Sequence, residues 1–294
     1  ITIPVPVTAD NCAVATVTND YNGTADASDV YPVGSTTVTY TVTDIHGNVT
    51  TCSFIVTITD NENPTITCPA NITQTADAVL CSAAVTINAP VVADNCAVAS
   101  VTNDYNGTAN ASDVYPVGTT TIIWTVTDIH GNASTCSMTV SVTDDEQPAV
   151  TCAADITQTA DASLCSATVT VPNPAATDSC AIDTIINDYN NTNDASDVYP
   201  VGTTTVIFTI TDIHGNVSSC SMNVTVTDNE QPTITCPANI TQTADAGLCS
   251  AIVTIAVPVT ADNCAVATVT NDYNGTADAS DVYPVGATTV TYTV

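Results

Sequence analysis

The chain has 294 residues, of which 30 are Asp or Glu and none is Lys or Arg, so its formal net charge is −30 at pH 7. Without basic side chains it cannot neutralise phosphates, which excludes nucleic-acid binding and disfavours contact with an acidic membrane surface. A hydrophobic content of 44% argues against disorder. The charge attracts cations, although solubility in a salty medium would account for it equally well.

A regular repeat organises the chain. Residues 8–34 and 260–286 are identical, and Cys68, Cys152 and Cys236 recur at a constant interval (152 − 68 = 236 − 152 = 84). About three and a half copies of one module therefore follow one another (294/84). We expect copies at 1–63, which lacks its first strand, at 64–147, at 148–231, and at 232–294, which lacks its last strand. Because both end copies are incomplete, we expect these residues to be a window on a longer protein.

The second copy shows the expected elements in chain order. Extended segments are predicted at 66–75, 81–87, 97–102, 113–117, 119–127 and 137–143. Thr alternates there with Val, Ile or an aromatic residue, the period-2 pattern of strands with one buried face. One inward position is always aromatic, which predicts a core residue: Tyr40, Trp124, Phe208 and Tyr292. With no helical pattern, the sequence predicts an all-β fold of tandem immunoglobulin-like β-sandwich modules in an elongated array.

Each full period carries four cysteines, which in the second copy stand at positions 68, 81, 96 and 136, at intervals of 13, 15 and 40. Zinc sites need close pairs such as C-x2-C, which are absent, so the cysteines predict disulfides rather than zinc. Disulfides persist in oxidising compartments, and we therefore expect an extracellular or cell-surface protein.

Several motifs resemble the HYR (hyalin repeat) domain, an immunoglobulin-like extracellular module related to fibronectin type III. They are TCPANIT (67–73), ADNCAV (93–98), YPVGTTT (115–121), VTDIHGN (126–132), STCSMTVSVTD (134–144) and the linker DDEQP (144–148). Similar arrays occur in large surface or secreted proteins of Bacteroidetes-type bacteria, including gliding adhesins, and in animal matrix proteins. The resemblance implies adhesion or a structural stalk without catalysis. The absence of Lys and Arg departs from the family, since any basic partner-binding residues of relatives have no counterpart here.

The resemblance also implies two disulfides, Cys68–Cys136 and Cys152–Cys220. The cysteines that then remain in each copy are expected to pair as Cys81–Cys96, Cys165–Cys180 and Cys249–Cys264. A bond between Cys12 and Cys52 would contradict this assignment.

Acidic and amide residues recur in three places: the linker between copies, the loop after the second strand, and the loop between the last two strands. In a sandwich whose chain enters at the end that carries these loops, all three converge at each junction. Carboxylate and amide oxygens in flexible loops suit Ca²⁺ better than a transition metal. The predicted Ca²⁺ ligands are Asp60, Glu62, Asp94, Asn95, Asp128, Asn132, Asp144, Glu146, Asp178, Asp212, Asn216, Asp228, Glu230 and Asp262. The alternative is that Asp and Asn supply turn chemistry only.

A polar loop, DYNGTADASD in the first copy, is a weaker candidate for a metal. Its Asp and Asn residues surround a Gly, as in calcium loops, but the helix-flanked twelve-residue pattern and the terminal Glu are missing. The candidate residues are Asp20, Asn22, Asp26, Asp29, Asp104, Asn106, Asp113, Asp188, Asp197, Asp272 and Asp281. The alternative is a solvated turn or a lateral contact surface.

The three histidines, His46, His130 and His214, each lie in a DIHGN turn and are expected to be hydrogen-bonded loop residues. Equal copies do not provide the single pocket that an enzyme needs, so we expect no catalysis.

Two functions remain. The first is a structural or adhesive element, a disulfide- and calcium-stiffened stalk or filament that associates with itself or with neighbouring modules of the same chain. The second is a glycan- or protein-binding module that uses Tyr21 and Tyr31 of the polar loop and gains avidity from repetition. We expect no membrane insertion in this segment.

Overall fold

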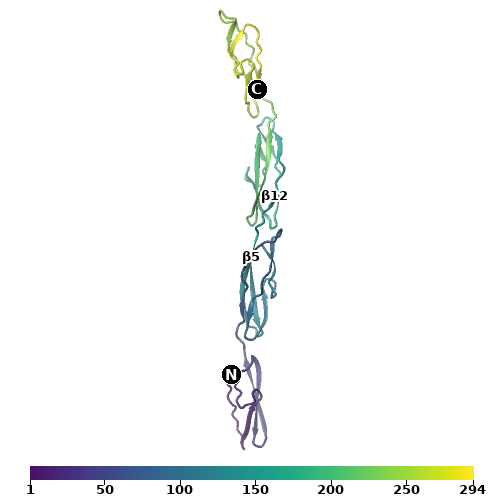
Figure 1. The fold of residues 1–294 in the computed structure, drawn as a ribbon, viewed down its shortest axis with the longest axis vertical. Coiled ribbons are helices and arrows are strands. Elements are labelled where there is room, and N and C mark those ends of the chain that lie inside the picture. The colour runs from purple at the N-terminus through teal and green to yellow at the C-terminus, as the bar shows by residue number, and fades with distance from the viewer. The chain divides into compact units, whose positions relative to one another are not determined.

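The computed structural model describes residues 1–294 and confirms the all-β prediction: it contains 25 strands and no helix (Figure 1). The chain forms two compact units. The first comprises Ile1–Gln74 and Ser82–Thr143, and the second comprises Thr75–Cys81 and Asp144–Val294.

The first unit is built from two larger sheets and two strand pairs. Its strands are β1 (Val14–Asn19), β2 (Gly34–Asp44), β3 (Val49–Ile58), β4 (Thr65–Thr67), β5 (Ile72–Thr75, whose last residue belongs to the second unit), β6 (Ser82–Val85), β7 (Val91–Ala93), β8 (Val98–Asn103), β9 (Asp113–Pro116), β10 (Gly118–Asp128) and β11 (Ala133–Thr143). They form sheets in the orders β1-β2-β3, β5-β11-β10-β8, β4-β7 and β6-β9.

The second unit repeats this plan. Its strands are β12 (Ala149–Thr151), β13 (Ile156–Thr159), β14 (Ser166–Val169), β15 (Ala175–Thr177), β16 (Ile182–Asn187), β17 (Asp197–Pro200), β18 (Gly202–Asp212), β19 (Val217–Thr227), β20 (Thr233–Thr235), β21 (Ser250–Val253), β22 (Val259–Ala261), β23 (Thr270–Asn271), β24 (Asp281–Pro284) and β25 (Tyr292–Thr293). The sheets are β13-β19-β18-β16, β12-β15, β14-β17, β20-β22, β21-β24 and β23-β25. Within the four-stranded sheet β13 runs parallel to β19.

The core of the third copy shows how the alternating sequence makes a sandwich. In β18, Val206, Phe208 and Ile210 are fully buried, whereas the Thr and Ile residues between them are exposed. Side chains of β18 and β19 share one apolar cluster with Val169 of β14 and Tyr199 of β17. Two sheets thus face each other across a single core, as predicted for an immunoglobulin-like sandwich.

The recurring aromatic position belongs to the core. Tyr40, Trp124 and Phe208 are at most 3% exposed, and Tyr292 is half-buried. Neither the Tyr40 hydroxyl nor the Trp124 Nε1 has a hydrogen-bond partner. An unpaired buried polar group lowers the stability of the fold, so these side chains stabilise the core through the apolar surface that they bury.

A second set of aromatic residues fastens the polar loop to the sandwich. The Tyr115 hydroxyl donates to the Ala111 carbonyl at 2.6 Å, and the Tyr199 hydroxyl donates to the Ala195 carbonyl at 2.7 Å. Both tyrosines are fully buried. Burial raises the pKa of Tyr115 and of Tyr199 to about 12, from an ordinary value of 10.0.

We predict alkaline unfolding from these two tyrosines. Because their pKa is higher in the folded state, the folded chain keeps protons that the unfolded chain loses above about pH 10. Their contribution to the free energy of unfolding is therefore complete below about pH 10 and is lost as the pH rises towards about 12. The measurement is denaturant unfolding of thiol-blocked protein against pH, followed by fluorescence of Trp124, the chain's single Trp.

Tyr115→Phe should lower the denaturation midpoint at neutral pH and flatten the alkaline decline in the second copy. Tyr105→Phe is the matched control, because it removes a more exposed hydroxyl of the same loop, which donates to the Val114 carbonyl. An identical alkaline profile in Tyr115→Phe and in the unchanged protein would contradict the assignment.

Candidate cation site at the junctions between copies

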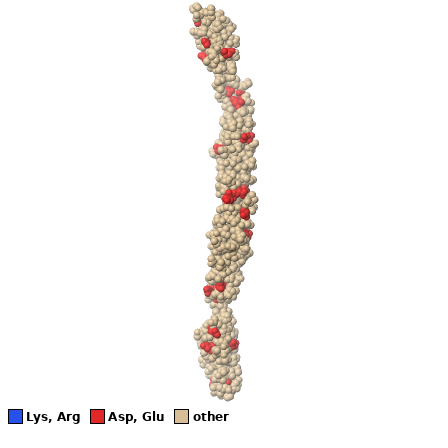
Figure 2. Space-filling view, in the orientation of Figure 1, with Lys and Arg blue, Asp and Glu red and all other residues tan.

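The three predicted acidic segments converge in the structure. Asp60 follows β3, Asp94 follows β7, and Asp128 ends β10. One carboxylate oxygen of each lies within 4.8 Å of the other two. Asp144, Asp178 and Asp212 form the same arrangement one period later. We call these two groups the first and second junction clusters; Figure 2 shows that the acidic residues gather in patches, with no basic residue beside them.

Asp128 is held in place by the tight turn that follows it. Its Oδ1 accepts hydrogen bonds from the N–H groups of His130 and Asn132, both at 2.8 Å. Its Oδ2 accepts one from Asn132 Nδ2 at 2.7 Å. Burial alone would raise the pKa of Asp128, but the hydrogen bonds from Asn132 and the turn outweigh it and leave the pKa below its ordinary value. Asp128 is therefore a buried, ionised carboxylate.

Asp60 ties the linker to the same turn. Its Oδ2 lies 3.2 Å from His130 Nδ1, and its backbone carbonyl accepts from Asn132 Nδ2 at 3.2 Å. Only 3% of its side chain is exposed. Hydrogen bonds from the Glu62 N–H and the Cys96 thiol lower the pKa of Asp60 below its ordinary value.

Asp94 supplies the least satisfied atom of the cluster. Its Oδ1 accepts from the N–H groups of Cys96 and Ala97, both at 2.9 Å. Its Oδ2 is buried and has no hydrogen-bond partner, and the same is true of Asp178 Oδ2. A buried, unpaired carboxylate oxygen beside two other carboxylates is unfavourable unless a cation balances it. The donor set of three carboxylates fits a hard divalent cation.

The other predicted ligands do not join the clusters. Glu62 and Glu146 are exposed, and their backbone N–H groups donate to Asp60 and Asp144. Asn95 is exposed, and its side chain acts as a hydrogen-bond donor that helps to lower the pKa of Asp60. Asn132 and Asn216 donate from Nδ2 and position the carboxylates.

At the third junction the predicted residues form no cluster of three. Asp228 Oδ1 accepts from Asn263 Nδ2 at 3.2 Å and from the Glu230 N–H at 3.0 Å. Glu230 Oε2 accepts from the Ser163 N–H. Asp262 Oδ1 accepts the N–H groups of Cys264 and Ala265, the turn role that Asp94 also has.

Sequence reasoning missed the contact between histidine and linker. His130 and His214 were expected to be loop residues only, yet each reaches the carboxylate of a linker Asp that precedes it by 70 residues, at 3.2 and 3.0 Å. Every pair of repeated residues keeps a constant offset in such an array, so nothing in the sequence singled out this contact. Cys96 also lies against the first cluster, where the hydrogen bond to Asp60 and burial raise the pKa of its thiol to about 11.

The polar loop, the weaker metal candidate, is organised by its own hydrogen bonds. Asn103, which is 4% exposed, accepts the N–H groups of Tyr105 and Asn106 and donates to Asn106 Oδ1 and to the Thr108 carbonyl. Its equivalents Asn19, Asn187 and Asn271 are also buried. This asparagine was not among the predicted site residues, because the loop sequence singled out for a metal starts one residue later, at Asp20 and its equivalents.

The candidate ligands of this loop are used as turn and strand acceptors and are not grouped around one point. Asp20, Asp104, Asp188 and Asp272 each accept a backbone N–H from the neighbouring long strand or its equivalent. Asp29, Asp113, Asp197 and Asp281 each accept the N–H of the next residue. Asp26 accepts the Ser28 N–H, and Asn22 and Asn106 accept from the Thr two residues on.

The tyrosines of the loop stack on each other. The ring centroids of Tyr21 and Tyr31 are 4.3 Å apart, and the Tyr21 hydroxyl donates to the Val30 carbonyl. Tyr31 is 6% exposed. Both rings are therefore engaged within the module, which leaves little aromatic surface for stacking on a ligand.

The disulfides follow two patterns. Cys68–Cys136 and Cys152–Cys220 form, as the family resemblance implied. The other expected pairs were wrong: the structure contains Cys81–Cys180 and Cys165–Cys264 in place of Cys81–Cys96 and Cys165–Cys180, and Cys249 is free. The reason is that Cys81 and Cys96 lie at opposite ends of a strand and its loop, whereas the next copy brings its own cysteine-bearing turn to Cys81.

Cys12, Cys52, Cys96, Cys236 and Cys249 are free. Cys12 and Cys52 thus do not bond to each other. For each of the five, the equivalent partner position lies outside residues 1–294.

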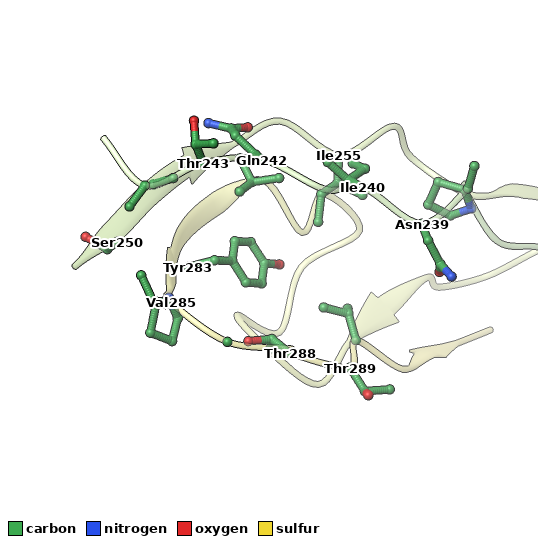
Figure 3. Close-up of a pocket in the computed structure, with 18 of the residues that line it drawn as sticks. Asn239, Ile240, Gln242, Thr243, Ser250, Ile255, Tyr283, Val285, Thr288 and Thr289 are labelled. Atoms are coloured by element: carbon green, nitrogen blue, oxygen red, sulfur yellow. The ribbon is translucent and has the colours of Figure 1, made fainter. Parts of the chain in front are cut away.

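A hollow in the last copy has a volume of ≈ 650 Å³. Figure 3 shows Tyr283, Ile240 and Ile255 around it. Its lining contains no Asp, Glu or His. In the third copy, Met222 and Val224 of β19 are buried in the core, and their equivalents also lie outside residues 1–294. The hollow therefore contains no carboxylate or imidazole group. The structure has no helix that is long and apolar enough to cross a membrane.

The fold and the repeated junction define an array of small, disulfide-bonded β-sandwiches. The model of the HYR domain matches residues 5–58, 59–142, 143–226 and 227–294, and the chain belongs to this family. It is 33% identical over 295 residues to hyalin of Strongylocentrotus purpuratus, a match that covers 98% of this chain and 24% of that protein. It is 31% identical to hyalin of Lytechinus variegatus, over 98% of this chain and 53% of that protein. The chain thus spans about a quarter and about half of these relatives.

Two solved structures show more distant likeness. The protocadherin gammaB7 EC3-6 cis-dimer structure aligns with 92% of this chain and 83% of that chain, at 15% identity and a TM-score of 0.33. Mouse cadherin-23 EC22-24 aligns with 78% and 91%, at 12% identity and a TM-score of 0.32. Scores of this size carry no inference about function. The bacterial context that the resemblance suggested has no support in the two hyalins, which come from other organisms.

Asn103→Ala removes four hydrogen bonds from a buried site and should destabilise the second copy by about 2–4 kcal/mol, at roughly 1 kcal/mol for each net bond. Asn103 lies opposite Trp124 in the β8–β10 ladder, so Trp124 fluorescence during denaturant unfolding reports the change. Asn110→Asp is the matched control, because the other copies carry Asp there, and it should change stability little. Equal stability of both variants would contradict the role of Asn103.

Proposed function

We propose that the chain is a structural and adhesive segment of an extracellular repeat array whose junction clusters bind Ca²⁺. Membership of the HYR domain family and the hyalin relatives support the array and its adhesive role. Four disulfides support an oxidising, extracellular location. The repeated, equivalent surfaces favour self-association or contact with neighbouring modules, and we propose no catalytic activity.

One observation carries the Ca²⁺ proposal. Each cluster places three carboxylates within 4.8 Å of one another, one of them with a buried oxygen that has no partner, in a chain without Lys or Arg. No internal side-chain cation other than a protonated histidine can offset their repulsion. A Ca²⁺ ion would convert this repulsion into shared coordination and would fasten the linker Asp to the loops of the following copy. The alternative explanation is that these residues serve only as hydrogen-bond acceptors in turns. It explains the two hydrogen bonds of Asp94 Oδ1, but not why Asp94 Oδ2 is buried without a partner.

The proposal places three residues of each cluster in direct contact with the ion: Asp60, Asp94 and Asp128, then Asp144, Asp178 and Asp212. The asparagines Asn132 and Asn216 position two of these carboxylates by donating hydrogen bonds. His130 and His214 contact the linker carboxylates, so a bound cation would share Asp60 and Asp144 with these rings. Protonation of the three carboxylates removes the charge that the cation would balance, so binding should weaken in acid.

The second function, avidity for a glycan or protein ligand at the polar loop, has less support. The loop tyrosines are stacked and hydrogen-bonded within the module, so a ligand would have to displace existing contacts. The exposed apolar side chains of the loop are Tyr273 of the last copy, which is 36% exposed, and a valine repeated in every copy, at Val30, Val114, Val198 and Val282.

The prediction is that calorimetric titration of chelator-treated protein with Ca²⁺ gives two sites, one for each complete cluster. Asp94→Asn should abolish the first site and Asp178→Asn the second, because each removes the charge of the unpaired oxygen. Ca²⁺ at about 100 times its Kd should raise the free energy of unfolding by about 2.7 kcal/mol per site.

Asp113→Asn is the matched control. Asp113 is an acidic residue of the second copy that lies outside the junction clusters and accepts the N–H of Val114, so this variant should keep both sites. Absence of heat and of any shift in melting temperature in the unchanged protein would remove the calcium proposal. Retention of both sites in the Asp94→Asn, Asp178→Asn double variant would move the ion elsewhere.

A further inference from the structure

The two sets of disulfides join residues at different separations along the chain. Cys68–Cys136 and Cys152–Cys220 each join residues 68 apart, within one period of the repeat. Cys81–Cys180 and Cys165–Cys264 each join residues 99 apart, which exceeds the repeat interval of 84 (152 − 68). The second pattern therefore bonds successive copies to each other.

We propose that residues 68–264 form a covalently redundant tether, in which two disulfide tracks continue from copy to copy and at least one disulfide bridges every peptide bond. The first track uses the bonds within a copy and crosses the linker from Cys136 to Cys152, an interval of 16 (152 − 136) along the chain. The second track uses the bonds between copies and crosses the segment from Cys165 to Cys180, an interval of 15 (180 − 165). This inference goes beyond adhesion and does not depend on cation binding.

The two tracks cross different parts of the backbone, and this makes the chain tolerant of a break. A cut in the linker between Cys136 and Cys152 interrupts the first track, but Cys81–Cys180 still joins the two sides. A cut between Cys165 and Cys180 interrupts the second track, and Cys152–Cys220 then maintains the connection. No single peptide-bond cleavage between Cys68 and Cys264 divides the chain.

The same bonds limit how far the chain can be stretched. A fully unfolded repeat would extend to about 280–300 Å at ~3.3–3.6 Å per residue. Along the first track only the segment from Cys136 to Cys152 can extend, to about 55 Å. The 11 residues of β10 already span about 36 Å in the fold. A load that acts through Cys68 and Cys220 can therefore lengthen the chain between them far less than complete unfolding would allow, even when a sandwich opens.

The linker is the segment that most needs such protection. Asp145, Glu146 and Gln147 are all exposed, and exposed connecting segments are preferred sites of proteolysis. The chain's three glutamates, Glu62, Glu146 and Glu230, all lie in linkers and are all exposed. A protease specific for glutamate thus cuts the natural chain only between copies, which makes the redundancy directly measurable.

The test is digestion of the full chain, thiol-blocked and in chelator, with a glutamate-specific protease, followed by gels with and without a dithiol reductant. Without reductant, the cut after Glu62 should release residues 1–62, whose Cys12 and Cys52 are free, and this release proves that the protease acted. Residues 63–294 should stay one species although they are cut after Glu146 and Glu230. The reductant, which is oxidised to its own disulfide as each protein disulfide becomes two thiols, should separate three pieces.

Two double variants identify the bond responsible. Cys81→Ser with Cys180→Ser should release residues 63–146 without reductant, whereas residues 147–294 stay joined through Cys165–Cys264. Cys68→Ser with Cys136→Ser is the matched control: it removes a bond of the same copy and should release nothing beyond residues 1–62. Separation of residues 63–294 of the unchanged protein without reductant would overturn the proposal.

A measurement on the unchanged protein keeps the test independent of how the variants fold. Mass spectrometry of non-reduced peptides should find Cys81 joined to Cys180 and Cys165 joined to Cys264. Peptides that join Cys81 to Cys96 would overturn the proposal even if the gels showed one species. Loss of calcium binding would leave all of these results unchanged, so failure here and failure of the proposed cation sites are distinguishable.

Discussion

The absence of Lys and Arg is the constraint on which the rest of the structure depends. With 30 acidic residues and no strong internal cation, each carboxylate must find its partners among N–H groups, hydroxyls and histidine. The structure meets this need mainly at turns, where backbone N–H groups are not used by a sheet ladder. Asp128 and Asp212 each accept two backbone N–H hydrogen bonds from the turn that follows them, and a third from the side-chain Nδ2 of its Asn. The only side-chain ion pairs are His130–Asp60 and His214–Asp144, which are charged pairs when the histidine is protonated.

Because the carboxylates accept their hydrogen bonds mainly from turns, the negative charge lies outside the apolar core. The long strands alternate Thr with apolar residues, so their inward faces carry no formal charge until Asp128 and Asp212 at the strand ends. The sandwich can then be small and apolar while the connections carry the negative charge. The separation is incomplete at the junction clusters, where three carboxylates meet and one oxygen remains without a partner. That imbalance is why the junction, and not the more conspicuous polar loop, is the better candidate for a cation.

The disulfides act on a different scale from the hydrogen bonds. A bond within a copy closes a loop of the unfolded chain and typically contributes about 2–4 kcal/mol to the stability of a small domain. The bonds between copies close longer loops and also connect one copy's Cys81 to the next copy's Cys180, close to Asp178 of the second cluster. Covalent bonds and acidic residues are thus concentrated at the same junction, where a chain of repeated modules would otherwise be held by a single peptide segment.

Sequence alone determined the period, the all-β class, the inward aromatic position and the acidic segments of the junction, because each is a local pattern repeated in every copy. Asp60, Asp94 and Asp128 could be grouped in advance, since the order of strands in a sandwich places their loops at one end. Tertiary structure decided the rest. Cys81 has two candidate partners of the same type, Cys96 and Cys180, and only the position of the next copy's turn distinguishes them. The histidine contacts were also visible only in the structure, because residues so far apart along the chain carry no mutual signal in a single sequence. The buried asparagine of the loop was visible only there as well, because in the sequence it looks like any other Asn of a turn.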